Sequence, residues 1–233
     1  MTLRRTAADH PAGNTGWAVP LALVALSVVP LTAGGLRLVE RLGGPAVMPA
    51  DERFASGFPV ALSLHLVAAA VYALGGAFQM SAGLRRRHPA WHRRAGRALV
   101  PAALVVATSG LWVTLLYSPQ PGTGDLLYGV RLVVAPLVAA FVVLGVTAIR
   151  RRDIPAHRAW MIRAYAVSLG AGTQVFSEGF GEVLLGHGDL TGDLLKTSGW
   201  VINLAVAEWV IRRPARLRAH RTRAFATTTE VPA

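Results

Sequence analysis

Six long apolar segments run along the chain, separated by shorter segments rich in charged residues, Gly and Pro. They cover residues 17–36, 58–80, 98–117, 128–149, 160–180 and 198–211. A helix of about 20 residues crosses the ~30 Å hydrocarbon core of a bilayer. The pattern therefore predicts an all-α fold, a polytopic transmembrane helix bundle of six spans, in which the last span is short.

The segments between and beyond the spans complete the predicted organisation. Residues 1–16 predict a flexible tail, residues 17–213 a six-helix transmembrane domain, and residues 214–233 a basic, disordered tail. Residues 37–57 and 181–197 are expected to be loops. A signal peptide is the alternative for the first apolar segment, but its length and the lack of a small-residue cleavage site favour an uncleaved helix.

Two basic stretches follow the second and fourth apolar segments. The first is RRRHPAWHRRAGR, residues 85–97, and the second is RRRDIPAHRAWMIR, residues 150–163. Each opens with three arginines and has a histidine seven positions after the first of them, His92 and His157. The match predicts a parallel internal repeat of spans two and three with spans four and five. Convergence is the alternative, because short cytoplasmic loops are commonly rich in arginine.

The positions of the arginines also predict an orientation. Six spans place the N-terminus, both basic stretches and the C-terminal tail on one side, which holds nearly all arginines except Arg37, Arg41, Arg53 and Arg131. Under the positive-inside rule both termini are cytoplasmic, and we expect a multi-pass protein of the bacterial inner membrane. The basic cytoplasmic face predicts contact with anionic lipids of the bilayer.

Composition agrees with a membrane protein. Of the 233 residues 53% are hydrophobic and 15% charged, and the mean hydropathy is +0.44. Soluble domains carry about 25% charged residues. The net charge of +12 comes from arginines clustered at the ends of apolar segments, which argues against a nucleic-acid partner. No cysteine is present, so disulfides, iron–sulfur clusters and thiolate zinc sites are excluded.

Polar side chains within or beside the spans are the candidate site residues, because such residues are costly in a membrane and often mark function. One set lies at the cytoplasmic boundary, where Glu208 needs a basic partner: Gln79, His92, Arg97, His157, Arg163, Asn203 and Glu208. A second set lies towards the other side: His65, Arg131, Gln174 and Glu178. Each also has a structural interpretation as an ion pair, a lipid contact or an interhelical hydrogen bond.

Several motifs carry a family resemblance. They are Gly76-x-x-Gln79, RRHPxxHRxxGR at residues 86–97, HRxWMxRxY at residues 157–165, and WxxNLxxAEW at residues 200–209. Over about residues 58–213 the chain resembles the bacterial membrane family catalogued as domain of unknown function 2306. The resemblance implies the architecture and the choice of motif residues. It implies no activity, because the family has no agreed one.

Three functions stay open from the sequence. The first is a non-catalytic protein that binds lipid, a small ligand or a protein partner at the boundary set. The second is a haem-b electron carrier with His92 and His157 as ligands, and His65 as a further candidate. The third is a small proton-coupled transporter, expected to form a homodimer, in which Glu208 and His65 exchange protons. No phosphate-binding loop or nucleophile elbow is present, so we do not expect an enzyme.

Overall fold

The computed structural model describes residues 15–50, 60–119 and 122–228, and within these ranges all regular structure is helical. The helices are α1 (Thr15–Arg41), α2 (Val60–Gln79), α3 (Ala82–Arg87), α4 (Pro89–Leu116), α5 (Asp125–Arg150), α6 (Ile154–Ser168), α7 (Gly170–Leu185) and α8 (Asp189–Thr228). The predicted all-α fold is therefore confirmed.

Five helices of the described chain are long and apolar enough to cross a bilayer. They are α1, α2, α4, α5 and the part of α8 up to Arg213. The predicted span over residues 160–180 is instead divided between α6 and α7, of 15 and 16 residues, and neither half is long enough to cross alone. The prediction of several transmembrane helices is confirmed, and the count of six spans stays a prediction.

The interruption between α6 and α7 has a local cause. The Ser168 hydroxyl donates to the Ala164 carbonyl oxygen at 2.9 Å, a bond that commonly bends helices. Two glycines follow, and both let other helices approach closely. A Cβ at Gly170 would overlap the indole of Trp200 on α8, and one at Gly172 would overlap the carbonyl oxygen of Leu26 on α1. The break is therefore where three helices come into close contact.

Two predicted irregular segments are helical. In the loop predicted over residues 181–197, only residues 186–188 lie outside α7 and α8, with Gly186 at φ 77° ending α7. Polar side chains that indicated a loop are used there in contacts between helices. Helix α8 also continues through residues 214–228, where a disordered tail is predicted, because Ala, Arg and Leu favour helix. Residues 1–14, 51–59 and 229–233 lie outside the described residues.

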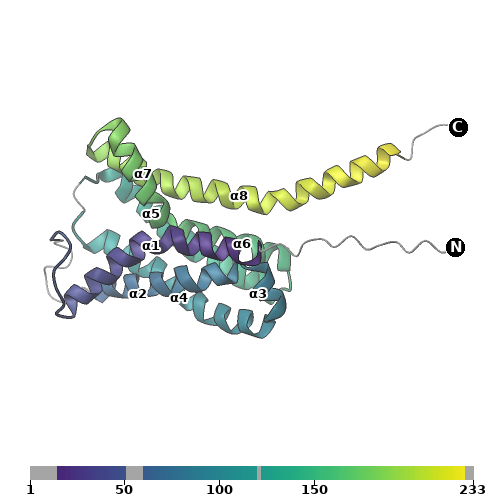
Figure 1. Cartoon of the computed structure of the whole chain (residues 1–233), viewed down its shortest axis with the longest axis horizontal. Coiled ribbons are helices and arrows are strands. Elements are labelled where there is room, and N and C mark those ends of the chain that lie inside the picture. The colour runs from purple at the N-terminus through teal and green to yellow at the C-terminus, as the bar shows by residue number, and fades with distance from the viewer. Residues whose placement is uncertain (1–14, 51–59, 120–121, 229–233) are drawn as a thin grey trace, which may run out of the picture.

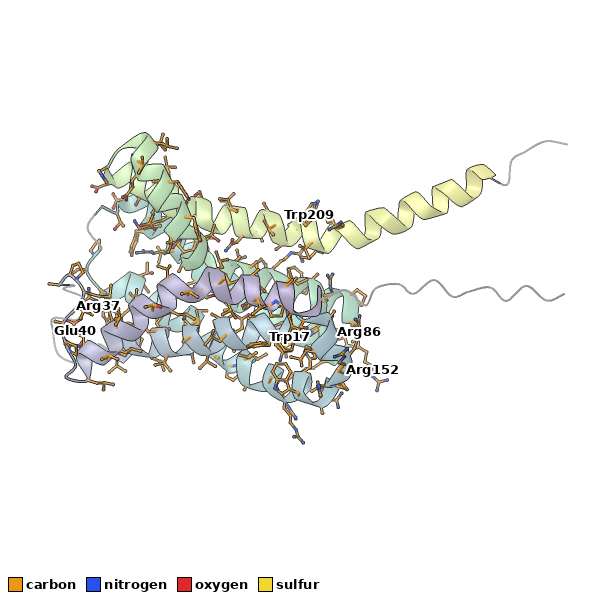
Figure 2. All side chains as sticks on the ribbon, viewed as in Figure 1. Trp17, Arg37, Glu40, Arg86, Arg152 and Trp209 are labelled. Carbon is orange, nitrogen blue, oxygen red and sulfur yellow. The ribbon has the colours of Figure 1, made fainter. Side chains whose placement is uncertain are left out.

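The helices run side by side as an elongated bundle (Figure 1). Helix α1 begins at the end of the bundle where α3 lies and where α5 meets α6. Arg86 and Arg152, from the two basic stretches, lie together at this end, while Arg37 and Glu40 lie at the opposite end (Figure 2). We call these the basic end and the opposite end.

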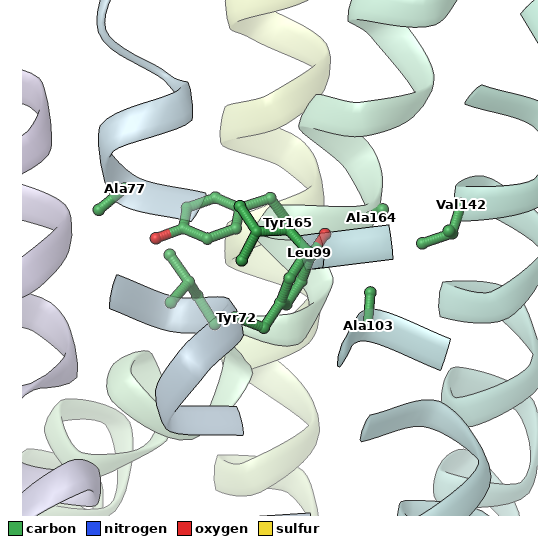
Figure 3. Packing of buried hydrophobic residues seen from close by; sticks show 8 residues of the cluster. Tyr72, Ala77, Leu99, Ala103, Val142, Ala164 and Tyr165 are labelled. Carbon is green, nitrogen blue, oxygen red and sulfur yellow. The ribbon is translucent and has the colours of Figure 1, made fainter. Parts of the chain in front are cut away.

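The centre of the bundle is built from small residues around two tyrosines (Figure 3). Tyr72 and Tyr165 meet edge to face, with ring centroids 5.7 Å apart, and the Tyr165 hydroxyl donates to the Ala73 carbonyl oxygen at 2.6 Å. A Cβ at Gly76 would overlap the Tyr165 ring. Small residues at such contacts let helix backbones approach each other, as is common in membranes.

Candidate functional site

The two basic stretches start their helices in the same way. Pro89 occupies the first turn of α4, and Pro155 occupies the first turn of α6. Backbone N–H groups in the first turn have no partner within the helix, so a proline there costs no hydrogen bond. The fourth helical residue is His92 in α4 and His157 in α6. Their backbone N–H groups donate to the carbonyl oxygens of His88 and Asp153, at 3.1 Å and 3.0 Å. The sequence match therefore corresponds to an equivalent local structure.

The basic stretches differ in what precedes the helix. The first contains the short helix α3, which Ser81 caps by accepting a hydrogen bond from the Leu84 N–H at 3.2 Å. In the second, the Asp153 carboxylate caps α6 by accepting from the Ala156 N–H at 3.0 Å. The extra helix brings Arg85 back towards the end of α2, where its guanidinium donates to the Gln79 carbonyl oxygen at 3.4 Å.

Basic side chains from α3, α4 and α6 gather around His92. The charges of Arg85, His157 and Arg93 all act on His92, and Arg158 and Arg86 act on Arg85. Burial and these two arginines lower the pKa of the Arg85 guanidinium below its ordinary value. We call this group the basic cluster: Arg85, Arg86, His92, Arg93, His157 and Arg158.

The two histidines of the basic cluster are held differently. His157 Nδ1 lies 2.9 Å from the Gly145 carbonyl oxygen, so Nδ1 carries a proton and donates it. His92 Nδ1 is shielded from solvent and has no hydrogen-bond partner among the described residues. The backbone carbonyl of His92 accepts from the Gln79 side chain at 3.3 Å. His157 thus links α6 to α5 by a hydrogen bond, whereas His92 Nδ1 makes no hydrogen bond among the described residues.

The carboxylate of Glu208 belongs to a separate group on α6 and α8. It accepts hydrogen bonds from Arg163 at 2.5 Å and from Arg212 at 3.1 Å. The Arg163 guanidinium also lies 4.7 Å from the centre of the Trp160 ring, within the range of a cation–π contact. Of the two arginines predicted as partners of Glu208, Arg163 makes the contact, whereas Arg97 is exposed on α4.

Most of the other predicted residues join α8 to α6 and α7. Asn203 donates to the Ala166 carbonyl oxygen at 2.9 Å and accepts from the Thr173 hydroxyl at 2.7 Å, on either side of the helix break. Gln174 donates to the Lys196 carbonyl oxygen at 2.8 Å, and Glu178 pairs with the Lys196 ammonium at 3.1 Å. These contacts hold the interrupted helix in place.

His65 lies apart from both groups, inside the bundle. Its Nδ1 lies 3.1 Å from the Val106 carbonyl oxygen and 3.1 Å from the Ser109 hydroxyl, both on α4. Arg131 on α5 is close enough for its charge to act on this imidazole. His65 also lines a cavity of about 190 Å³ between α1, α2 and the break between α6 and α7.

Asp193 is an important residue that the sequence pattern does not reveal. Its side chain is only 1% exposed and accepts hydrogen bonds from the N–H groups of Gly124, at 2.8 Å, and Leu127, at 3.1 Å. A residue of α8 therefore caps the start of α5, where the helix dipole also favours a negative charge. In the sequence, Asp193 is one of several acidic residues in a segment expected to be a loop. No local pattern predicts its contact with Leu127, 66 residues away.

These features define a helical membrane protein with polar groups concentrated at one end of the bundle. The family described as "Predicted membrane protein (DUF2306)" matches residues 62–211, so the chain belongs to that family and the resemblance is confirmed. The match includes the basic cluster and Glu208 but not α1. No match is found among curated proteins or among solved structures.

Proposed function

We propose that this chain is a six-pass protein of the bacterial inner membrane that binds the phosphate of an anionic lipid headgroup at the basic cluster. The observation that carries the proposal is the gathering of six basic side chains at one end of the bundle. Among the described residues no carboxylate pairs with Arg85, Arg93 or Arg158. Like charges held together are unfavourable unless an anion lies between them.

The nearest carboxylates of this end are already engaged. Asp153 caps α6, and Glu208 pairs with Arg163 and Arg212. Phosphate fits the basic cluster because its oxygens accept several charge-assisted hydrogen bonds at once. The lipid is the proposed source because the cluster lies at the end of the membrane-crossing helices.

The six-pass arrangement rests on treating α6 and α7 as one interrupted span. Together they run between the basic end and the opposite end, as the other long helices do. In this arrangement α1, α4 and α6 all start at the basic end, and the positive-inside rule makes that end cytoplasmic. The equivalent helix starts at His92 and His157 support the internal repeat, with α2 and α4 as one unit and α5 and α6 as the other.

The test compares lipid retention between two variants that each remove two positive charges. The protein is purified in nanodiscs containing phosphatidylglycerol and phosphatidylcholine, and retained lipid is counted by native mass spectrometry. Arg85→Gln with Arg158→Gln removes two charges from the basic cluster. Arg150→Gln with Arg151→Gln is the matched control, because both residues are exposed at the same end.

General attraction to anionic lipid, about 1 kcal/mol for each arginine, is lost in the cluster variant and in the control alike. The cluster variant also loses two hydrogen bonds to a charged phosphate, about 1.5 kcal/mol or more each, so its phosphatidylglycerol affinity should fall at least about 100-fold further than that of the control. Equal losses in both variants would overturn the site and leave only a general surface charge. Complete displacement by millimolar inorganic phosphate would identify a soluble phosphorylated ligand in place of the lipid.

The haem alternative has weaker support. Among the described residues, His65 is the one histidine that lines the cavity of about 190 Å³, and pockets for drug-sized ligands are about 300–1,000 Å³. His92 and His157 lie near each other at the basic end, outside that cavity. A Soret band in protein purified from haem-supplemented cells would reinstate this alternative. The homodimer stays a prediction.

A further inference from the structure

The cavity beside His65 is a second candidate site, independent of the basic cluster. Helix α1 forms one wall with residues from Ser27 to Leu38, and α2 forms another with residues from His65 to Ala73. Leu169 and Gly172 close it at the break between α6 and α7. The volume of about 190 Å³ exceeds the roughly 30 Å³ of one water several-fold. It can therefore hold a small organic molecule.

The cavity lies between two interruptions of helical backbone. Pro30 in α1 has no N–H, so the carbonyl oxygen of Leu26 loses its partner within the helix. Gly172, just after the α6–α7 break, packs against this same carbonyl oxygen, where a Cβ would overlap it. Interrupted helices at membrane depth are tolerated mainly where they line a cavity, and they form substrate sites in transporters.

Three hydroxyl groups of the wall are already committed. Ser27 donates to the Leu23 carbonyl oxygen at 2.9 Å, Tyr165 to Ala73 at 2.6 Å, and Ser168 to Ala164 at 2.9 Å. These protons are not available to a ligand. Most of the remaining wall is Leu, Ala, Gly and Val. Tyr72 also lines the cavity, and its hydroxyl has no hydrogen-bond partner among the described residues. The cavity thus suits a mainly apolar molecule, and an acceptor stronger than a phenol oxygen must come from another group.

His65 supplies that group. A carbonyl oxygen can only accept, so the contact from Nδ1 to Val106 requires the proton of the neutral imidazole to lie on Nδ1. The Ser109 hydroxyl donates to Val105, so it too can accept from Nδ1. Nε2 is then an acceptor, and it has no hydrogen-bond partner among the described residues. A histidine held in this way is ready to accept one hydrogen bond.

We propose that this cavity binds a small, uncharged, mainly apolar molecule that carries one hydroxyl or N–H donor, which His65 Nε2 accepts. Such a molecule reaches the cavity from the bilayer, into which it partitions. The volume of the cavity limits the size of the ligand, and its apolar wall favours an uncharged molecule. His65 favours a ligand that carries a hydrogen-bond donor. The proposal is independent of lipid binding at the basic cluster.

The experiment uses two probes of similar shape, phenol and toluene, which differ in the hydroxyl. Their binding to the full chain in nanodiscs is measured by titration calorimetry, with empty nanodiscs subtracted. Phenol should bind about three- to tenfold more tightly than toluene, the ratio expected for one neutral hydrogen bond. His65→Leu should abolish the preference and leave toluene binding.

Ala69→Leu tests the cavity without touching the imidazole. Ala69 lines the cavity one helical turn from His65, so a leucine there should reduce the binding of both probes at least tenfold. Val67→Leu is the matched control, because Val67 is 50% exposed and faces away from the cavity. Equal affinity for the two probes, or unchanged binding in Ala69→Leu, would overturn the proposal. No detectable binding of either probe would overturn it as well.

Discussion

The two basic stretches match closely in sequence but differ in how they are held. Both start a helix with a proline and place a histidine at its fourth position. In the second stretch, His157 binds the Gly145 carbonyl oxygen and Arg163 pairs with Glu208. In the first, His92 Nδ1 has no partner in the described chain, and the arginines are not paired with carboxylates.

This difference shows how one local pattern can serve two purposes. His157 and Arg163 of the second stretch are bound by α5 and α8, so they contribute to stability. In the first stretch, helix α3 brings Arg85 to the basic cluster, where it stays available to an anion together with Arg158 of the second stretch. Substitutions of His157 or Arg163 should therefore change stability, and substitutions of Arg85 or Arg158 should change binding. Four predictions test that division, in order of decreasing effect.

The largest effect is expected at two glycines, Gly145 shortly before the second stretch and Gly96 within the first. A Cβ at Gly145 would lie 2.6 Å from the Met161 Sδ and 3.5 Å from the Trp160 Cβ. Gly145→Val should lower stability by about 1–3 kcal/mol through overpacking. A Cβ at Gly96 meets nothing within 4 Å, so Gly96→Ala should raise stability by up to about 1 kcal/mol through helix propensity. Thermal melts in detergent measure both, and a stable Gly145→Val protein would contradict the close packing of α5 on α6.

The next effect separates the two histidines. His157→Leu removes the hydrogen bond to Gly145 and should lower stability by about 0.5–1.5 kcal/mol. His92→Leu removes a buried polar atom that has no partner, so stability should stay the same or rise. Melting temperature is the measurement, with lipid retention recorded on the same samples. If His92→Leu proves the more destabilising change, the proposed division between the stretches is wrong.

A smaller effect is expected for the carboxylate between α6 and α8. Glu208→Gln weakens the contacts with Arg163 and Arg212 and should lower stability by up to about 1 kcal/mol, because the Glu208 side chain is 25% exposed. Glu182→Gln is the control, since its partner His187 is 84% exposed. The melting temperature should fall only in Glu208→Gln. Equal melting temperatures would show that the pair contributes nothing to holding α8.

The smallest effect is expected at Arg212. This side chain is 66% exposed and lies one helical turn from Glu208. Arg212→Ala should change stability by no more than about 0.5 kcal/mol, the usual size of an exposed pair on one helix. A melting shift larger than that of Glu208→Gln would mean that Arg212, rather than Arg163, is the main partner of Glu208.

Much of the fold follows from local physical chemistry. Five of the six apolar segments are long helices, because such a helix satisfies its own backbone groups across a bilayer. Pro89 and Pro155 lie in the first turns of α4 and α6, where proline is favoured, and both helices begin before the predicted spans at residues 98 and 160. The extent of α7 and α8 could not be predicted, because polar residues such as Glu182, Asp193 and Lys196 indicate a loop when their partners are unknown.

The sequence alone determined that this is a helical membrane protein with most of its arginines clustered beside apolar segments and a histidine at the same position of each basic stretch. Hydropathy, charge position and proline are local properties, so each can be read without a fold. The tertiary structure alone decided that His157 Nδ1 is bound and that His92 Nδ1 has no partner among the described residues. It also brought His65, Pro30 and the break after Ser168 around one cavity. Such contacts join residues distant in sequence, and they depend on how closely the helices pack.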